Sequence, residues 1–169
     1  VKPAHDGSSI GVTKLAEPTV AALRKALEDA AGVRGDEVLV EEYIHGREFT
    51  VAVLDGRALP VIEIRAPEGD YDFNNKYFGD AVHYDCPAKL EDEAAATLGS
   101  LCERAFAAVG ARGWSRIDAL QRADGSFALL EINTSPGMTP HSLVPMAARA
   151  VGMDYADLCL KVLSLARCD

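Results

Sequence analysis

The sequence lacks the features that would assign it to several common classes of protein. It contains no cluster of Lys and Arg side chains and has a formal net charge of −9, whereas nucleic-acid-binding proteins normally carry a basic face. No apolar run approaches the ~18 residues that a membrane-spanning helix needs, and no apolar signal-peptide segment opens the chain. We therefore expect no nucleic-acid partner and no membrane insertion.

Cysteine is scarce and irregularly spaced. The four cysteines, at positions 86, 102, 159 and 168, include no pair in C-x-x-C spacing, and a disulfide framework is unusual at this size and density. Cys102 and Cys159 lie in helical apolar patterns, where cysteine behaves as a small buried hydrophobic residue. We expect reduced thiols and a cytoplasmic location.

The chain of 169 residues has the length of one ordinary domain. It opens with Val1-Lys2-Pro3 and has no initiator methionine. This opening is typical of a piece cut from a larger protein, and we expect the chain to be such a piece.

Periodicity and turn residues predict an α+β fold with largely antiparallel strands. Glu17-Pro18-Thr19 opens a helix that Gly32 is expected to end, and Asp124-Gly125 is a hairpin turn signal. Residues 66–80 show no periodicity, and a loop of this length in a compact domain is commonly functional. The expected helices are 17–32, 90–109, 142–151 and 155–166, and the expected strands are 38–40, 48–54, 58–64, 114–121 and 127–132.

Three oxygen-bearing side chains are expected on one face of the last hairpin. Glu131 and Asn133 are two residues apart on a strand and share a face, and a register centred on the turn places Asp118 across from them. Two carboxylates and an amide are hard oxygen ligands that suit Mg²⁺. The alternative is a set of solvated surface acids, which the apolar strand neighbours make less favourable because isolated carboxylates beside a core are costly.

Two further segments have the chemistry of a nucleotide site. Lys2 is expected to end a strand, and the small residues of the loop 5–11 let backbone N–H groups approach an anion. Glu41 and the backbone near Ile44 would suit an adenine edge, and Glu48 would suit ribose hydroxyls. Taken alone, a surface turn and solvated acids are the commoner explanations of these segments.

In this order the segments resemble the ATP-grasp superfamily, and within it the D-alanine–D-alanine ligases. The stretches that carry the resemblance span nearly the whole chain: VKPAHDGSSIGV, VEEYIHGREFTVAVL, NNKYF, SRIDAL and LLEINTSPGMTPHSLVPMAARAVG. The resemblance implies an ATP-grasp fold with a mostly antiparallel sheet flanked by helices. It also implies that residues 1–44 end the small ATP-grasp subdomain, that residues 45–169 form the large C-terminal subdomain, and that the family's N-terminal domain is missing.

The resemblance implies a role for each matching residue. Asp118, Glu131 and Asn133 would ligate two Mg²⁺ ions, for which Mn²⁺ could substitute. Arg116 and the Gly137 N–H would stabilise an oxyanion, and Ser142 with the Leu143 backbone would hold the carboxylate of the acceptor D-alanine. The ATP-binding residues implied are Lys2, Ser8, Ser9, Glu41, Tyr43, Ile44, Glu48, Lys76, Leu120 and Leu130, with Lys76 on a lid formed by the loop 66–80. Many relatives have a basic residue where Glu42 stands.

The implied reaction is the ATP-dependent joining of two D-alanines through an acylphosphate, which supplies a peptidoglycan precursor. The complete enzyme is expected to be a homodimer, and this chain alone is expected to be inactive. Tyr77 would hydrogen-bond Ser8 and favour D-alanine over D-lactate as acceptor. The open alternatives are a D-alanine–D-lactate or other ATP-grasp ligase, and a truncated nucleotide-binding module without catalysis.

Overall fold

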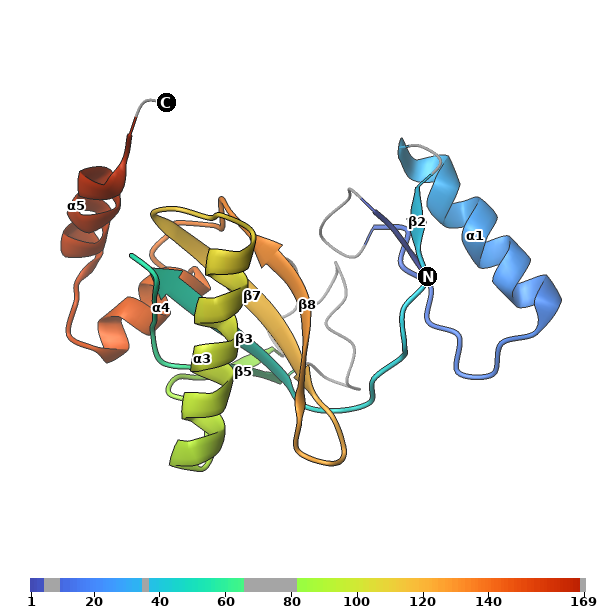
Figure 1. Cartoon of the computed structure of the whole chain (residues 1–169), viewed down its shortest axis with the longest axis horizontal. Helices are drawn as coiled ribbons and strands as arrows, with labels where there is room; N and C mark the ends of the chain where they lie inside the picture. Colours follow the sequence, from blue (N-terminus) through green and yellow to red (C-terminus); the bar gives the residue numbers. More distant parts are fainter. Residues whose placement is uncertain (5–9, 35–36, 66–81, 168–169) are drawn as a thin grey trace. The chain divides into compact units, whose positions relative to one another are not determined.

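The computed structural model describes residues 1–4, 10–34, 37–65 and 82–167 (Figure 1). Contacts group them into two units. Unit 1 holds the described residues up to Ile44 together with Val82, and unit 2 holds residues 45–65 and 83–167.

Unit 1 contains two short strands and a helix. Strand β1 (Lys2–Pro3) pairs antiparallel with β2 (Val38–Leu39), and α1 (Val20–Arg34) packs on both strands. The helix starts later than expected, because the Thr19 hydroxyl accepts a hydrogen bond from the Ala22 N–H at 3.1 Å and so acts as the N-terminal cap. The prediction that Gly32 ends this helix is wrong. Glycine adopts helical angles at a modest cost, and α1 continues to Arg34.

Unit 2 is built on an antiparallel sheet in the order β6-β5-β3-β7-β8, with β4 pairing to the end of β3. The expected strand 58–64 is divided in two, because Pro60 has no N–H to contribute to a ladder, although the Leu59 N–H still donates to the Ala52 carbonyl at 2.8 Å. The strands are β3 (Glu48–Leu54), β4 (Arg57–Ala58), β5 (Ile62–Arg65), β6 (His83–Asp85), β7 (Trp114–Gln121) and β8 (Phe127–Asn133).

Helices cover both faces of this sheet (Figure 1). On one face α3 (Asp92–Ala108) buries Leu98, Cys102 and Phe106 against a row of apolar strand residues. On the other face α4 (Leu143–Ala150) and α5 (Tyr155–Leu165) pack over Ala52 and Leu54. The residues of β3 that precede Ala52 on this same face are not part of the apolar cluster under α4 and α5. That end of the face is therefore left for polar side chains.

The described cysteines are free thiols. Cys102 is fully buried, as expected, and burial raises the pKa of its thiol to about 12. Cys159 is only half-buried, so the expectation of a core position is met less completely there.

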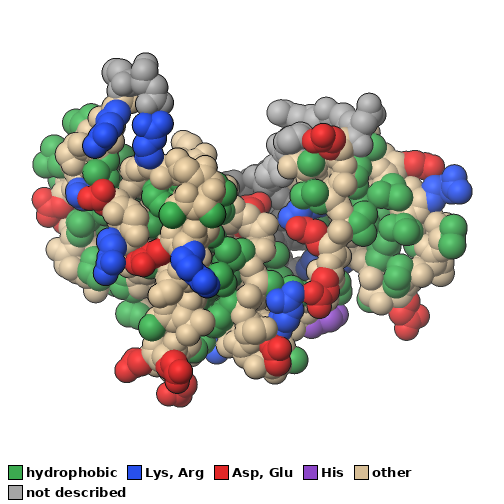
Figure 2. Space-filling view, in the orientation of Figure 1, with side chains coloured by type: hydrophobic (Ala, Val, Ile, Leu, Met, Phe, Trp, Pro, Cys, Tyr) green, Lys and Arg blue, Asp and Glu red, His purple; other side chains and the backbone are tan. Residues whose placement is uncertain are grey.

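Among the described residues, no helix combines the length and the hydrophobicity needed to cross a bilayer. On the face of the molecule drawn in Figure 2, Lys and Arg side chains are interspersed with Asp and Glu, and no continuous basic surface forms there.

Candidate active site

The polar part of the sheet face is organised in rows across β3, β7 and β8. One row pairs Glu48 with Leu120, and the next pairs Thr50 with Asp118. The row after that pairs Ala52 with Arg116. Residues two apart on a strand share a face, so these rows lie on the face that α4 and α5 cover farther along.

Strand β8 extends the rows through a β-bulge. Near the turn Ala119 pairs with Leu129, one residue away from a register centred on Asp124-Gly125. A register shift follows, with Leu130 as the additional residue, and beyond it Asp118 pairs with Glu131. The bulge changes which face the later residues occupy. Its effect is seen in Leu129 and Ile132, which are three residues apart and yet both pack on the α3 side. The prediction that Asp118 faces Glu131 is confirmed, although the path to it contains this irregularity.

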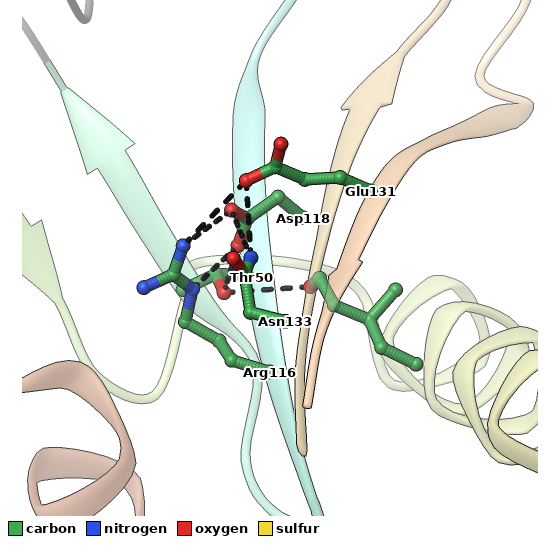
Figure 3. Close-up of polar contacts among 6 residues, drawn as sticks. Thr50, Arg116, Asp118, Glu131 and Asn133 are labelled. Carbon is green, nitrogen blue, oxygen red and sulfur yellow. Dashed lines mark hydrogen bonds and ion pairs between the residues drawn. The ribbon is translucent and has the colours of Figure 1, made fainter. Parts of the chain in front are cut away.

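Asp118 is the centre of a hydrogen-bonded cluster (Figure 3). Its side chain is only 8% exposed. Arg116 donates from Nε to Asp118 Oδ1 at 2.9 Å and from Nη2 to Oδ2 at 2.7 Å, a bidentate pair. Thr50 donates from Oγ1 to Asp118 Oδ1 at 2.6 Å. The carboxylate is therefore held by donors on both of its oxygens.

Glu131 and Asn133 complete the cluster. Asn133 donates from Nδ2 to Glu131 Oε1 at 3.0 Å and, more weakly, to Asp118 Oδ2 at 3.4 Å. Glu131 Oε1 lies 3.9 Å from Arg116 Nη2, and its side chain is 41% exposed. The three oxygen-bearing side chains predicted from the sequence are thus brought together by the structure.

This donor set fits a hard divalent cation. Two carboxylates and an amide supply oxygen ligands, and a half-turn of the Asn133 amide would present Oδ1 instead of Nδ2. In the described ranges no three His, Cys, Asp or Glu side chains form a metal-binding group, so a metal here depends on the amide and on non-protein ligands. Arg116 already places positive charge between the two carboxylates, where a cation would also be attracted.

The loop after β8 brings Gly137 and Ser142 together. Gly137 is exposed, and a Cβ placed on it would lie 3.1 Å from Ser142 Oγ. Ser142 is the N-cap of α4, and its Oγ accepts a hydrogen bond from the Thr139 N–H at 3.0 Å. Tyr155, the first residue of α5, donates to the Met138 carbonyl at 2.5 Å. Leu143, predicted to contribute its backbone, begins α4.

Unit 1 holds the remaining described residues predicted to bind ATP. Lys2 Nζ lies 2.7 Å from Glu41 Oε2 in an ion pair, and Lys14 Nζ lies 5.8 Å from the centre of the Tyr43 ring. Ile44 is half-buried. Four predicted site residues lie outside the described residues: Ser8, Ser9, Lys76 and Tyr77.

Sequence reasoning missed Thr50, Thr139 and Tyr155. Thr50 carried a usable signal, because it is a polar residue inside the apolar strand Phe49 to Leu54 and pairs with a candidate metal ligand. Thr139 contacts the Ser142 hydroxyl and Tyr155 contacts the Met138 carbonyl, and no periodicity marks such contacts.

Comparisons with known proteins identify a family to which the chain is similar. The family model described as the D-Ala D-Ala ligase C-terminus matches residues 1–164. A D-alanine–D-alanine ligase of Bordetella petrii is 52% identical over 172 residues, which cover 99% of this chain and 52% of that protein. The chain thus spans about half the length of the curated relatives it matches.

Solved structures of ligases are also similar to this chain. The D-alanine–D-alanine ligase of Bacillus anthracis complexed with ATP has a TM-score of 0.74 and 28% identity, covering 87% of this chain and 46% of that one. The VanG D-Ala:D-Ser ligase of Enterococcus faecalis has a TM-score of 0.82 and 32% identity, covering 97% of this chain and 48% of that one.

Proposed function

The chain belongs to the family of D-alanine–D-alanine ligases, to the C-terminal part of these enzymes, and from this premise we propose that it carries the catalytic site of an ATP-dependent ligase that joins two D-alanines. Its fold is accordingly ATP-grasp, as the sequence resemblance implied. We further propose that residues 1–44 belong to the small ATP-grasp subdomain and residues 45–169 to the large one.

The cluster around Asp118 is the observation that carries the proposal. It combines cation-binding carboxylates with the Arg116 guanidinium on one rigid sheet face. Phosphoryl transfer needs positioning and charge stabilisation rather than a covalent nucleophile from the protein. A face that holds both acidic and basic groups at hydrogen-bond distances has the composition for that task.

ATP would extend along the rows of this face. In this proposal Glu48 binds the ribose hydroxyls, and Leu120 and Leu130, both half-buried, contact the adenine. The remaining nucleotide ligands are contributed by Lys2, Ser8, Ser9, Glu41, Tyr43, Ile44 and Lys76.

Asp118, Glu131 and Asn133 would hold two Mg²⁺ ions, or Mn²⁺ in their place. When bound, the ions would neutralise the charge of the triphosphate. The protein itself supplies one positive charge beside these carboxylates, the guanidinium of Arg116.

The reaction would proceed in two transfers. The carboxylate of the first D-alanine attacks the γ-phosphorus of ATP, giving an acylphosphate and ADP. The amino group of the second D-alanine then attacks the acyl carbon, a proton is lost from nitrogen, and phosphate leaves. Arg116 and the Gly137 N–H would stabilise the tetrahedral oxyanion. Ser142 and the N–H of Leu143, at the start of α4, would bind the carboxylate of the acceptor.

The acceptor is proposed to be D-alanine because of Tyr77, whose contact with Ser8 would close the site over the second substrate. The product would serve peptidoglycan synthesis in the cytoplasm, and the complete enzyme would act as a homodimer. Alternatives are a ligase that uses D-lactate or another acceptor, and a nucleotide-binding module without catalysis.

The test is an assay of the complete ligase that contains this chain. With ATP, Mg²⁺ and D-alanine it should release phosphate and form D-alanyl-D-alanine, and D-serine and D-lactate should be poorer acceptors. The 169-residue chain alone should release no D-alanine-dependent phosphate. Nucleotide binding by the complete protein without dipeptide formation would contradict the proposal and favour the non-catalytic module.

A further inference from the structure

Thr50 is a buried polar residue that the proposed mechanism leaves without a role. It lies in the middle of β3 and is 1% exposed. Its neighbours along the strand, Phe49 and Val51, are fully buried apolar residues. A hydroxyl in such a place is costly unless it is hydrogen-bonded, so its contacts decide what it does.

The Thr50 hydroxyl has two acceptors nearby but only one hydrogen to donate. The Ile117 carbonyl is 3.4 Å from Oγ1, at the limit of a hydrogen bond. Asp118 Oδ1 is 2.6 Å away, a short and therefore strong hydrogen bond for a hydroxyl donor. The proton therefore belongs to the bond with Asp118.

Thr50 and Arg116 hold Asp118 in different ways. Arg116 covers both carboxylate oxygens and brings a positive charge, which repels a cation that approaches the same carboxylate. Thr50 is neutral and binds Oδ1 only, from the neighbouring strand. Its bond does not involve Oδ2, which accepts from Arg116 Nη2 in this structure. It also adds no repulsion, so it is compatible with a cation that takes the place of Arg116 at Oδ2.

We infer that Thr50 is a positioning residue, which fixes the carboxylate of Asp118 through Oδ1 so that Oδ2 can exchange its contact with Arg116 for the cation of ATP. The inference rests on the proposed function, since it needs Asp118 to be a metal ligand. Hydrogen-bond partners of ligating groups commonly affect metal affinity by 10–100-fold.

The test compares Thr50→Val, which keeps the shape and removes the hydroxyl, with Thr50→Ser, which keeps the hydroxyl. The matched control is Ser115→Ala. Ser115 is fully buried in β7, and its Oγ has no hydrogen-bond partner among the described residues. Ser115→Ala thus removes a buried hydroxyl that is close to Asp118 in the sequence but makes no hydrogen bond to it.

The probe is Mn²⁺, titrated into the complete ligase in the presence of ADP and followed by electron paramagnetic resonance. Thr50→Val should raise the Kd for Mn²⁺ about 10-fold or more, whereas Thr50→Ser and Ser115→Ala should stay within about threefold of the wild type. In turnover, Thr50→Val should raise the Mg²⁺ concentration for half-maximal rate and leave the KM for D-alanine unchanged.

Equal Mn²⁺ affinity in Thr50→Val and the wild type would overturn the inference. A wild-type ligase that binds no Mn²⁺ with ADP would instead contradict the proposed function, so the two failures are distinguishable. Thermal unfolding of each variant checks the fold. If Thr50→Val does not fold, Thr50→Ala takes its place in the same titration, with the same expected and contradicting results.

Discussion

Gly137 and Ser142 lie so close that a methyl group on Gly137 would come within 3.1 Å of Ser142 Oγ. The N–H proposed to bind the oxyanion and the hydroxyl proposed to bind the acceptor carboxylate are therefore adjacent. A change at one residue must affect the position of the other.

Gly137→Ala should lower kcat and raise the KM for D-alanine at the acceptor site, while the KM for ATP stays near the wild-type value. The added Cβ displaces Ser142 by a few tenths of an ångström, and a loss of up to 10²-fold is reasonable for a small misplacement of reacting groups. Steady-state kinetics with each substrate varied in turn measures this. Gly99→Ala is the control, because a Cβ there meets only the Ala58 methyl at 3.4 Å. Normal acceptor kinetics in Gly137→Ala would contradict the proximity argument.

Glu131→Gln and Asp118→Asn should differ in what they damage. Glu131 is exposed and bonded mainly to Asn133, so its change should leave stability nearly intact while it strongly lowers kcat. Asp118 is buried in the bidentate pair with Arg116, and its change should destabilise the fold by about 3 kcal/mol. We expect Glu131→Gln to be the more damaging to catalysis. Near-normal kcat of Glu131→Gln at saturating Mg²⁺ would refute the role given to Glu131.

Glu63 should make stability depend on pH. Arg47 donates to both Glu63 oxygens at 2.8 Å, and this hydrogen bonding is the main reason that the pKa of Glu63 is lowered. A lowered folded-state pKa contributes stability that is present above the unfolded value of about 4.3 and is lost as pH falls through the folded value. Glu63→Gln should therefore cost about 2 kcal/mol at pH 7 and less at acidic pH.

Urea unfolding followed by tryptophan fluorescence measures this difference, because the chain has a single tryptophan, Trp114 of unit 2. The control is Lys161→Gln, which removes an exposed pair with Asp55 in the same unit and should change the unfolding midpoint little. A pH-independent difference between Glu63→Gln and the wild type would show that the ion pair is not the source of the effect.

Ser115→Ala should keep or raise stability, by up to about 1 kcal/mol. The hydroxyl is fully buried with no partner among the described residues, and a buried polar group without a hydrogen bond is unfavourable. The same fluorescence experiment measures the change. A loss above about 1 kcal/mol would mean that Ser115 has a partner, such as a buried water.

The sequence predicted the elements of the fold well where a period or a cap defined them. The pair α4 and α5 and the hairpin of β7 and β8 lie within a residue or two of expectation. The errors occurred where local signals were permissive: Gly32 fits inside a helix, and Pro60 interrupts a strand that its neighbours favour.

For the candidate site, alternation along a strand predicts the face of a side chain but not its rotamer. It therefore placed Asp118, Glu131 and Asn133 together, yet it could not show that Arg116 already covers Asp118. The bulge at Leu130 was also invisible, because a single additional residue leaves no mark in composition. Near the turn, the observed pairing is one residue away from the expected register. The bulge restores the expected register at Asp118, and for that reason alone the prediction for this residue was right.

The rows of the sheet face also set a length. Successive rows through Glu48, Thr50 and Ala52 are two residues apart along β3, so each step is about 6.8 Å and the three rows span about 14 Å. The extended backbone sets this spacing, and the pairing of β3 with β7 keeps the rows in register. A nucleotide lying along β7 would have its ribose and its reacting phosphate held at two fixed positions, so the site would select ligands by the number of phosphates as well as by the base.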